Sequence, residues 1–425
     1  MRLLRFGMEN FRCFREAVEV SFVATSQQDE PAHRMASAHA PNGVLPVLGV
    51  YGANAAGKTS VITALHVLRS FVERSFAWTP EQRIVWTPWA MRTGAGAAHT
   101  QLDLDFELGG VRYHYGFRFD ARAFHEEWLY RWPDARRQVV FERNDAAEPA
   151  WRFGPSLRGD KARLAKATRS NALFLSTAAH NNHEELGAVY RAIVGGVHEA
   201  LPIELNGFPV FFEDAPILDP ARHEQFMRVL RALDLGCVDY EPVAMSLDPA
   251  MSLPQLAEVF QPDALEQVRS ALTAQRKLYR IVLHREGPDG ARWHLPSDME
   301  SSGTNVLLQR VNDLMQLTEG VIAVDELETS LHPDVCAAII DLFTSGRSNE
   351  RGVQLLFTTH SRSLMEHLRR DEVLLVEKDA DGVATLTCAA DYKDLRARDS
   401  LERAYASGRV GAVPLLLDLD LALGA

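Results

Sequence analysis

Hydrophobic and polar residues alternate between Gln101 and Trp132. Apolar side chains occupy every second position from Leu102 to Leu108 and again from Val111 to Phe119, with Gly109-Gly110 between the two runs. Successive side chains of a β-strand point to opposite faces of its sheet, so a period of two predicts strands with one buried face. A glycine pair at the break is typical of a hairpin turn. The pattern therefore predicts an antiparallel β-meander.

A different period appears after Gly57. The preceding run, Val44–Tyr51, is apolar except for Pro46 and Gly49 and predicts a buried strand. Beyond Gly57, the apolar residues are spaced by four, three and four positions: Val61, Leu65, Leu68 and Val72. This spacing is that of one face of an α-helix. A buried strand, a short glycine-containing turn and a helix are therefore expected in this order.

The rest of the chain is divided by the same criteria. Residues 1–23 are expected to form two short strands, and 24–43 a loop. Helices are predicted at 158–168, 183–200, 220–234, 255–277, 303–318, 333–345 and 361–369. Strands are predicted at 278–284, 291–295, 320–325, 353–359 and 372–377. Helices and strands alternate from residue 303 onward, which implies a mostly parallel sheet.

Composition narrows the class of protein. The 425 residues carry 45 Lys and Arg against 57 Asp and Glu, a formal charge of −12, which argues against a surface coated for nucleic acid but permits a local basic groove. No uncharged apolar run reaches the roughly 18–20 residues of a membrane span, and no apolar stretch follows the basic N-terminus, so neither a membrane protein nor a signal peptide is expected. The four cysteines lie far apart, which favours a reducing, cytoplasmic setting.

The turn before the predicted helix carries a phosphate-binding pattern. Gly52–Thr59 reads GANAAGKT and matches G-x-x-x-x-G-K-[ST]. Such a loop points backbone N–H groups inward at the positive end of the following helix, while the lysine reaches the β- and γ-phosphates and the hydroxyl binds Mg²⁺. The residues expected to hold the phosphates are Gly52, Asn54, Ala55, Ala56, Gly57, Lys58, Thr59 and Ser60.

A second chemical group follows the predicted strand at 320–325. Asp325 and Glu326 end an apolar run, where the carboxyl ends of parallel strands bind ligands. Asp325 is expected to bind Mg²⁺ together with Thr59, and Glu326 to orient or deprotonate the attacking water. Acids at strand ends are common, so this motif is informative mainly beside the phosphate loop.

The distance along the chain between the phosphate loop and the acidic motif indicates which type of ATPase this is. Lys58 and Asp325 are 325 − 58 = 267 residues apart, so the two halves of the site bracket a large insertion. Ser301 and Gly303 open a helix before Asp325, where free N–H groups suit an anion but an ordinary N-cap is also possible. His360 follows an apolar strand and is placed to hydrogen-bond the γ-phosphate.

In this order the motifs resemble those of ABC-type ATPase heads of the SMC-like and RecF-like branch. Asn10–Phe14 resembles the N-terminal strand-turn motif of that branch, and Ser330–Pro333 resembles its D-loop. The resemblance is closest to the RloA-like ATPases, prokaryotic proteins linked to restriction and antiphage defence. Segments that extend it are Glu127–Tyr130, Asn171–Leu175 and Tyr405–Arg409.

The resemblance implies an α/β fold, a P-loop NTPase head of the ABC type with a mostly parallel sheet plus an antiparallel β-meander, interrupted by a mainly helical insert. The implied organisation is an N-terminal lobe of the head at 1–155, the insert at 156–279, a C-terminal lobe at 280–380 and a tail at 381–425.

The resemblance also implies a head-to-tail pair of subunits with ATP and Mg²⁺ held between them. Each site would take Lys58, Glu326 and His360 as catalytic residues from one subunit, and Ser301 and Gly303 from the other. Arg12 would approach the phosphates, as the matching arginine does in this branch.

Three other features are read as structural. Five basic residues lie mostly on one face of a predicted helix: Arg158, Lys161, Arg163, Lys166 and Arg169. We interpret this face as exposed to solvent rather than as a nucleic-acid site. His180, His183 and Glu184 lack a further metal ligand. Asp418 and Asp420 suggest a nuclease motif, but too few residues follow the head to form such a domain.

Two main functions remain open on these grounds. The first is an ATPase that senses or regulates a separately encoded effector, such as a nuclease, in antiphage defence. The second is a RecF-like factor that uses ATP in DNA maintenance and would bind nucleic acid itself. A scaffold that binds ATP without turnover is disfavoured by Glu326, and a transporter ATPase by the length of the insertion.

Overall fold

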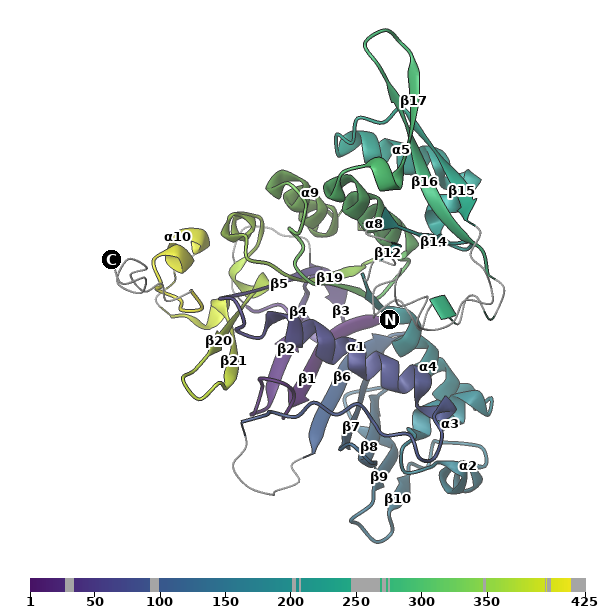
Figure 1. The fold of residues 1–425 in the computed structure, drawn as a ribbon. Helices are drawn as coiled ribbons and strands as arrows, with labels where there is room; N and C mark the ends of the chain where they lie inside the picture. Colours follow the sequence, from purple (N-terminus) through teal and green to yellow (C-terminus); the bar gives the residue numbers. More distant parts are fainter. Residues whose placement is uncertain are drawn as a thin grey trace. The chain divides into compact units, whose positions relative to one another are not determined.

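A computed structural model gives the fold. It describes residues 1–26, 34–91, 99–200, 204–205, 208–245, 268–269, 273, 276–346, 349–393, 395 and 399–413. The chain divides into two compact units: Met1–Glu199 with Glu319–Leu327 and Ala337–Ala425, and Ala200–Thr318 with Glu328–Cys336. The backbone therefore passes between the units four times. Figure 1 shows the elements of both.

The β-meander expected at 101–132 is confirmed and is larger than expected. It forms a seven-stranded sheet in the order β10-β9-β8-β7-β6-β1-β2, with antiparallel neighbours throughout. The strands are β1 (Arg2–Glu9), β2 (Val18–Ser21), β6 (Thr100–Leu108), β7 (Val111–Phe119), β8 (Phe124–Trp132), β9 (Gln138–Asn144) and β10 (Trp151–Phe153). The apolar positions of the alternating pattern, such as Leu104 and Phe106, are fully buried.

A second sheet in the first unit is mostly parallel, as expected. Its order is β11-β18-β19-β5-β20-β21, and only β21 runs antiparallel to its neighbour. The strands are β5 (Val47–Gly52), β11 (Val197–Glu199), β18 (Val321–Val324), β19 (Gln354–Thr358), β20 (Val373–Lys378) and β21 (Ala384–Cys388). The carboxyl ends of β5, β18, β19 and β20 therefore meet at one edge of the sheet.

Helix α1 (Lys58–Arg74) contacts strands of both sheets, which share one hydrophobic core (Figure 1). The remaining helices of this unit are η1 (Ser75–Ala77), α2 (Lys161–Ala167), α3 (Phe174–His180), α4 (Glu184–Gly196), η5 (Arg362–His367), η6 (Arg370–Glu372), η7 (Ala389–Asp391) and α10 (Leu401–Ala406), and α9 (Pro333–Thr344) begins in the second unit and ends in the first. Within the described residues, no helix combines the length and apolar character that crossing a membrane requires.

Three local expectations in this unit differ from the structure. The helix expected at 183–200 ends at Gly196, because Val197–Glu199 pair with β18 as strand β11. The stretch expected to be a loop at 24–43 contains a hairpin, β3 (Met35–Ser37) and β4 (Ala40–Val44), whose short strands bury few side chains and so leave no clear alternation. The helix expected at 361–369 is the 3₁₀ helix η5, since only six residues are helical there and 3₁₀ geometry is typical of such short connectors.

Among its described residues, the second unit contains both helices and strands. It contains β12 (Glu204–Leu205), β13 (Phe208–Pro209), β14 (Phe211–Phe212), η2 (Pro216–Leu218), η3 (Pro220–Arg222), α5 (His223–Ala232), β15 (Asp239–Met245), β16 (Leu278–Glu286), β17 (Arg292–Pro296), η4 (Ser297–Met299) and α8 (Ser302–Gln316). Its core gathers Phe226, Leu230, Ile281, Leu283 and Leu308. Most of the helix expected at 255–277, and both Asp418 and Asp420, lie outside the described residues.

The unit boundaries consequently differ from the expected insert at 156–279. Helices α2, α3 and α4 pack in the core of the first unit, whereas β16, β17 and α8 belong to the second. The apolar faces of these elements decide the grouping, and helical periodicity alone does not reveal which core an amphipathic helix joins.

Two segments of the RloA-like resemblance have a structural role. The fully buried carboxylate of Glu127 accepts hydrogen bonds from the backbone N–H groups of Phe174 (2.6 Å) and Leu175 (3.0 Å) at the start of α3, and from the hydroxyl of Tyr115 (3.0 Å). Asn171 donates its amide to the carbonyl oxygens of Thr79 (2.8 Å) and Gln82 (3.1 Å). These segments therefore anchor α3 to the meander sheet.

Candidate functional site

The N-terminus of α1 is open for an anion. Gly57 precedes the helix with φ 124°, no side chain caps the first turn, and no acidic residue lies in it. A helix start leaves its first N–H groups without backbone partners and carries the positive end of the helix dipole. A Cβ at Gly57 would lie 2.5 Å from Cys13 Sγ, so only glycine fits this approach. The start of α1 therefore has the chemistry that suits an anion such as a phosphate group.

Lys58 is folded against this loop. Its Nζ donates hydrogen bonds to the carbonyl oxygens of Gly52 and Ala53, both at 3.1 Å, and lies 3.4 Å from Nδ1 of His360. The side chain is almost entirely buried. The same ammonium group can exchange these carbonyl partners for phosphate oxygens, to which hydrogen bonds are stronger because both groups are charged.

Thr358 at the end of β19 organises the two acids that follow β18. Its hydroxyl donates to Oδ1 of Asp325 at 2.5 Å and accepts the backbone N–H of Glu326 at 2.8 Å. Glu326 adopts a left-handed conformation with φ 48°, which costs energy for a residue other than glycine. The neighbouring strand therefore holds both acids in a defined arrangement.

These segments converge on one pocket of about 470 Å³. Most of the predicted site residues line it: Arg12, Asn54, Ala55, Gly57, Lys58, Thr59, Ser60, Glu326 and His360. Gly52, Ala56 and Asp325 do not line it; Gly52 and Ala56 are buried behind the loop, and Asp325 lies against Thr358. The pocket thus gathers residues from the carboxyl ends of four neighbouring strands, β18, β19, β5 and β20.

Three residues of the site were not expected from the sequence. Cys13 and Lys378 also line the pocket, and Thr358 positions the acids. Lys378 ends β20 and donates a hydrogen bond to the carbonyl oxygen of Ala55. The position of Thr358 and Lys378 at the ends of parallel strands was a signal that could have identified them. Cys13 follows directly after Arg12 in the turn.

The available oxygen ligands suit Mg²⁺. Thr59 offers a hydroxyl in the pocket and Asp325 a carboxylate held by Thr358. Mg²⁺ prefers such hard oxygen donors and keeps several waters, with substrate phosphates completing its coordination. A magnesium ion held here would neutralise charge on the phosphates of a bound nucleotide.

Ser301 and Gly303 belong to the second unit, at the start of α8. The hydroxyl of Ser301 accepts the N–H of Thr304 at 3.1 Å, so this residue caps the helix. A Cβ at Gly303 would lie 2.7 Å from the carbonyl oxygen of Ser330, so the helix start and the D-loop-like segment pack together closely. Ser301 is thus an N-cap in this structure.

Asp313 in α8 is expected to make the stability of the protein depend on pH. The residue is half-buried, but its Oδ2 is shielded from solvent and its Oδ1 accepts a hydrogen bond from Gln309 at 2.8 Å. Burial raises the pKa of Asp313 to about 7, with Arg310 opposing the shift. Between the ordinary pKa near 3.8 and about 7, the unfolded chain has lost a proton that the folded chain keeps.

The free energy of unfolding should therefore fall as pH rises from about 4 to 7, by about 1.4 kcal/mol for each pH unit. Asp313→Asn is expected to remove this part of the decline. Urea unfolding at pH 5 and pH 8 measures it, with the exposed Asp334→Asn as a control. Equal pH dependence in the wild type and Asp313→Asn would contradict the assignment.

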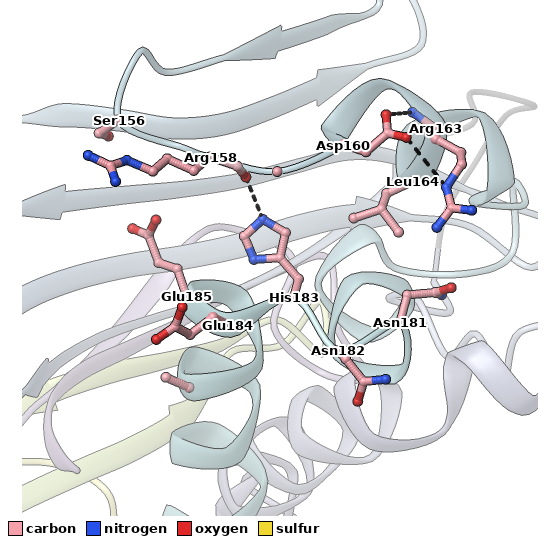
Figure 2. A pocket seen from close by; sticks show the side chains of 12 residues that line it. Ser156, Arg158, Asp160, Arg163, Leu164, Asn181, Asn182, His183, Glu184 and Glu185 are labelled. Atoms are coloured by element: carbon pink, nitrogen blue, oxygen red, sulfur yellow. Dashed lines mark hydrogen bonds and ion pairs between the residues drawn. The ribbon is translucent and has the colours of Figure 1, made fainter.

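A larger hollow of about 650 Å³ lies between α2 and the start of α4 (Figure 2). His183 is engaged there by backbone groups, because its Nε2 lies 2.9 Å from the carbonyl oxygen of Arg158 and its Nδ1 accepts the N–H of Leu186. Lys161 and Arg169 bond to backbone carbonyl oxygens. Lys161, Arg169 and His183 therefore help to hold the fold together, whereas Arg158, Arg163 and Lys166 are exposed.

Comparisons with known proteins find a matching family model and similar solved structures. The family model described as "AAA domain, putative AbiEii toxin, Type IV TA system" matches residues 47–366, more than half of the chain. A solved SMC head bound to the C-terminal winged-helix domain of ScpA is similar, with 14% identity, a TM-score of 0.41 and coverage of 96% of this chain and 100% of that one. The SMC head domain of Thermotoga maritima is also similar, with 12% identity, a TM-score of 0.36 and coverage of 91% and 99%. A search of curated proteins found no match.

Proposed function

Since the chain belongs to the AAA-domain family whose model spans residues 47–366, we propose that it binds and hydrolyses ATP with Mg²⁺ as an ABC-type ATPase. The observation that carries the proposal is the single pocket in which the open start of α1, Glu326 and His360 meet. This set supplies each part that hydrolysis of a nucleoside triphosphate needs: a phosphate cradle, a water-orienting acid and a donor near the terminal phosphate.

The residues divide the chemistry among them. The N–H groups at the start of α1 and Lys58 hold the β- and γ-phosphates, and Thr59 and Asp325 hold Mg²⁺. Glu326 accepts a proton from the attacking water or orients it, and His360, 3.4 Å from Lys58, donates to the γ-phosphate. Arg12 and Lys378 add positive charge at the rim of the pocket.

We further propose that two chains pair head to tail, so that Ser301 and Gly303 of one subunit complete the site of the other. The close packing of Gly303 against Ser330 supports this, since it makes one continuous surface from the helix start and the D-loop-like segment. Ser301→Asp gives a sharp test. Aspartate is as good an N-cap as serine, so α8 should persist, but its charge would repel a phosphate.

Mixing two defective variants distinguishes a shared site from a self-contained one. Lys58→Ala and Ser301→Asp should each be inactive alone. In an equal mixture, half of the pairs would contain one complete site, so about a quarter of wild-type ATPase activity should return. Ser301→Asn, which keeps the cap without the charge, is the matched control. No recovery, together with a monomer in MgATP by analytical ultracentrifugation, would contradict the paired arrangement.

The biological role that we propose is regulation of a separately encoded effector in prokaryotic antiphage defence, for which a nuclease is the leading candidate. The RloA-like motifs support this role. The RecF-like alternative needs a nucleic-acid surface. Of the basic residues around α2, Lys161 and Arg169 bond to backbone carbonyl oxygens, which leaves Arg158, Arg163 and Lys166 exposed for such a surface.

A further inference from the structure

The central strand of the second unit's sheet carries a histidine between two other potential metal ligands. Strand β16 pairs with β15 on one side and with β17 on the other. In this register His284 lies opposite Asp239 of β15 and opposite His294 of β17. Glu241 is two residues beyond Asp239 and so points to the same face. Three neighbouring strands thus present two imidazoles and carboxylates on one face.

The opposite face of this sheet is fixed by the core. Tyr240, Ile281 and Leu283 alternate with the residues above and are buried among the helices of the unit. A slip of the register by one residue would expose these side chains, so the orientation of His284 and Glu241 is determined by packing.

The His284 side chain is only 12% exposed, and its Nε2 is shielded from solvent without a hydrogen bond to any described residue. The nearest charged atom is Oε1 of Glu241 at 3.9 Å. The His294 ring lies with its centroid 4.2 Å from that of His284. One ligand atom from each of His284, His294 and Glu241 lies within 4.8 Å of the other two.

We propose that His284, His294 and Glu241 bind one divalent transition-metal ion of the Zn²⁺ class. Metal–ligand bonds of about 2.0–2.2 Å place two ligands of one cation roughly 3–4 Å apart, so 3.9 Å is too long for a hydrogen bond but close to a shared cation. Two imidazoles and one carboxylate form a ligand set typical of such ions, with a fourth position left for water.

A metal ion here would cross-link three strands. It would tie the β16–β17 hairpin to β15 in the unit that also contains Ser301. Asp239 does not compete for the ion, because its Oδ1 already lies 2.7 Å from Nε2 of His223 and accepts the N–H of Tyr240. Its negative charge beside His284 adds to the attraction for a cation.

A second cluster of possible metal ligands differs from the proposed site in the hydrogen bonds of its carboxylate. His99, Asp120 and His125 also lie together, but Oδ2 of Asp120 forms an ion pair with Nε2 of His125 at 3.1 Å. The other oxygen of Asp120 accepts the N–H groups of Arg122 and Ala123. This carboxylate is satisfied by backbone N–H groups, whereas Oε1 of Glu241 lies 3.9 Å from Nε2 of His284, a nitrogen that makes no hydrogen bond to a described residue.

The test uses the full-length, nucleotide-free protein without a polyhistidine tag, stripped with a chelator and titrated with Co²⁺. The wild type should bind one equivalent with d–d absorption, and Zn²⁺ should displace it. His294→Ala and Glu241→Gln, both at exposed positions, should each weaken binding by roughly tenfold or more. His367→Ala removes a histidine that also faces a carboxylate, Asp341 at 3.3 Å, and should bind like the wild type.

Thermal unfolding provides an independent readout. Zn²⁺ should raise the Tm of the wild type and of His367→Ala but not that of His294→Ala, because only a folded site binds the ion. Absence of Co²⁺ absorption in the wild type, or equal binding by all variants, would overturn the proposal. Neither result depends on ATP, so a failure here leaves the proposed ATPase function untouched.

Discussion

Glu326→Gln should lower kcat for ATP hydrolysis by roughly 10²–10³-fold while leaving ATP binding close to that of the wild type. Glutamine keeps the size of the side chain and the backbone bond from Glu326 N–H to Thr358, but it cannot accept a proton from water. Steady-state phosphate release gives kcat, and titration with a fluorescent ATP analogue gives Kd.

The surface carboxylate Glu366, in the short helix that follows β19, provides the matched control. Glu366→Gln should hydrolyse ATP like the wild type, since this side chain is exposed and does not line the pocket. Turnover by Glu326→Gln within a factor of about two of the wild type would mean that the acid does not act on the water, and would favour a protein that only binds nucleotide.

The same variant provides a route to the partner. Slow hydrolysis should hold the ATP-bound state, so Glu326→Gln purified from the native host in MgATP should retain whatever binds that state. A stoichiometric nuclease or toxin would support the defence role. Nucleic acid without a protein partner would instead support the DNA-maintenance role.

Lys58→Ala is expected to weaken ATP binding by about 30- to 150-fold and to remove detectable hydrolysis. The lost charge-assisted hydrogen bonds to phosphate account for roughly 2–3 kcal/mol. ADP, which lacks the γ-phosphate, should lose less affinity than ATP. Calorimetric titration with both nucleotides measures the difference.

A lysine away from the pocket is the control for this change. Lys166 in α2 is exposed, and Lys166→Ala should bind ATP normally. Because Lys58 is buried, circular dichroism and the Tm must first show that Lys58→Ala is folded. Unchanged affinity in a folded Lys58→Ala protein would contradict the placement of the phosphates at the start of α1.

The sequence predicted the first unit better than the second. The alternation from Leu102 to Phe119 and the four-three-four spacing after Gly57 predict β6, β7 and α1 because each element buries one face against the same core. In the second unit, the strands β12, β13 and β14 have two residues each, too few to show a period. The pairing of these strands depends on tertiary contacts, so no local sequence pattern predicts it.

The residues of the candidate site also divide into those that the sequence predicts and those that it does not. Gly57, Lys58 and Glu326 are identifiable because their chemistry requires a fixed local pattern, and the structure brings them together. Lys378 reaches the phosphate loop only because β20 pairs with β5, a contact between residues more than 300 positions apart. Thr358 likewise contacts Asp325 through the pairing of β18 with β19. The spacing of residues along the chain does not predict these contacts between paired strands.

The four passages of the backbone between the two units affect how the protein can be synthesised and dissected. Leu331 and Val335 pack on the core of the second unit, yet they are translated after β18 and Glu326 of the first. A fragment ending at residue 318 would therefore lack part of its own core. We conclude that the lobe carrying Ser301 cannot finish folding on the ribosome until Glu326 has been made, and that it is not a module that could be transplanted as one continuous segment.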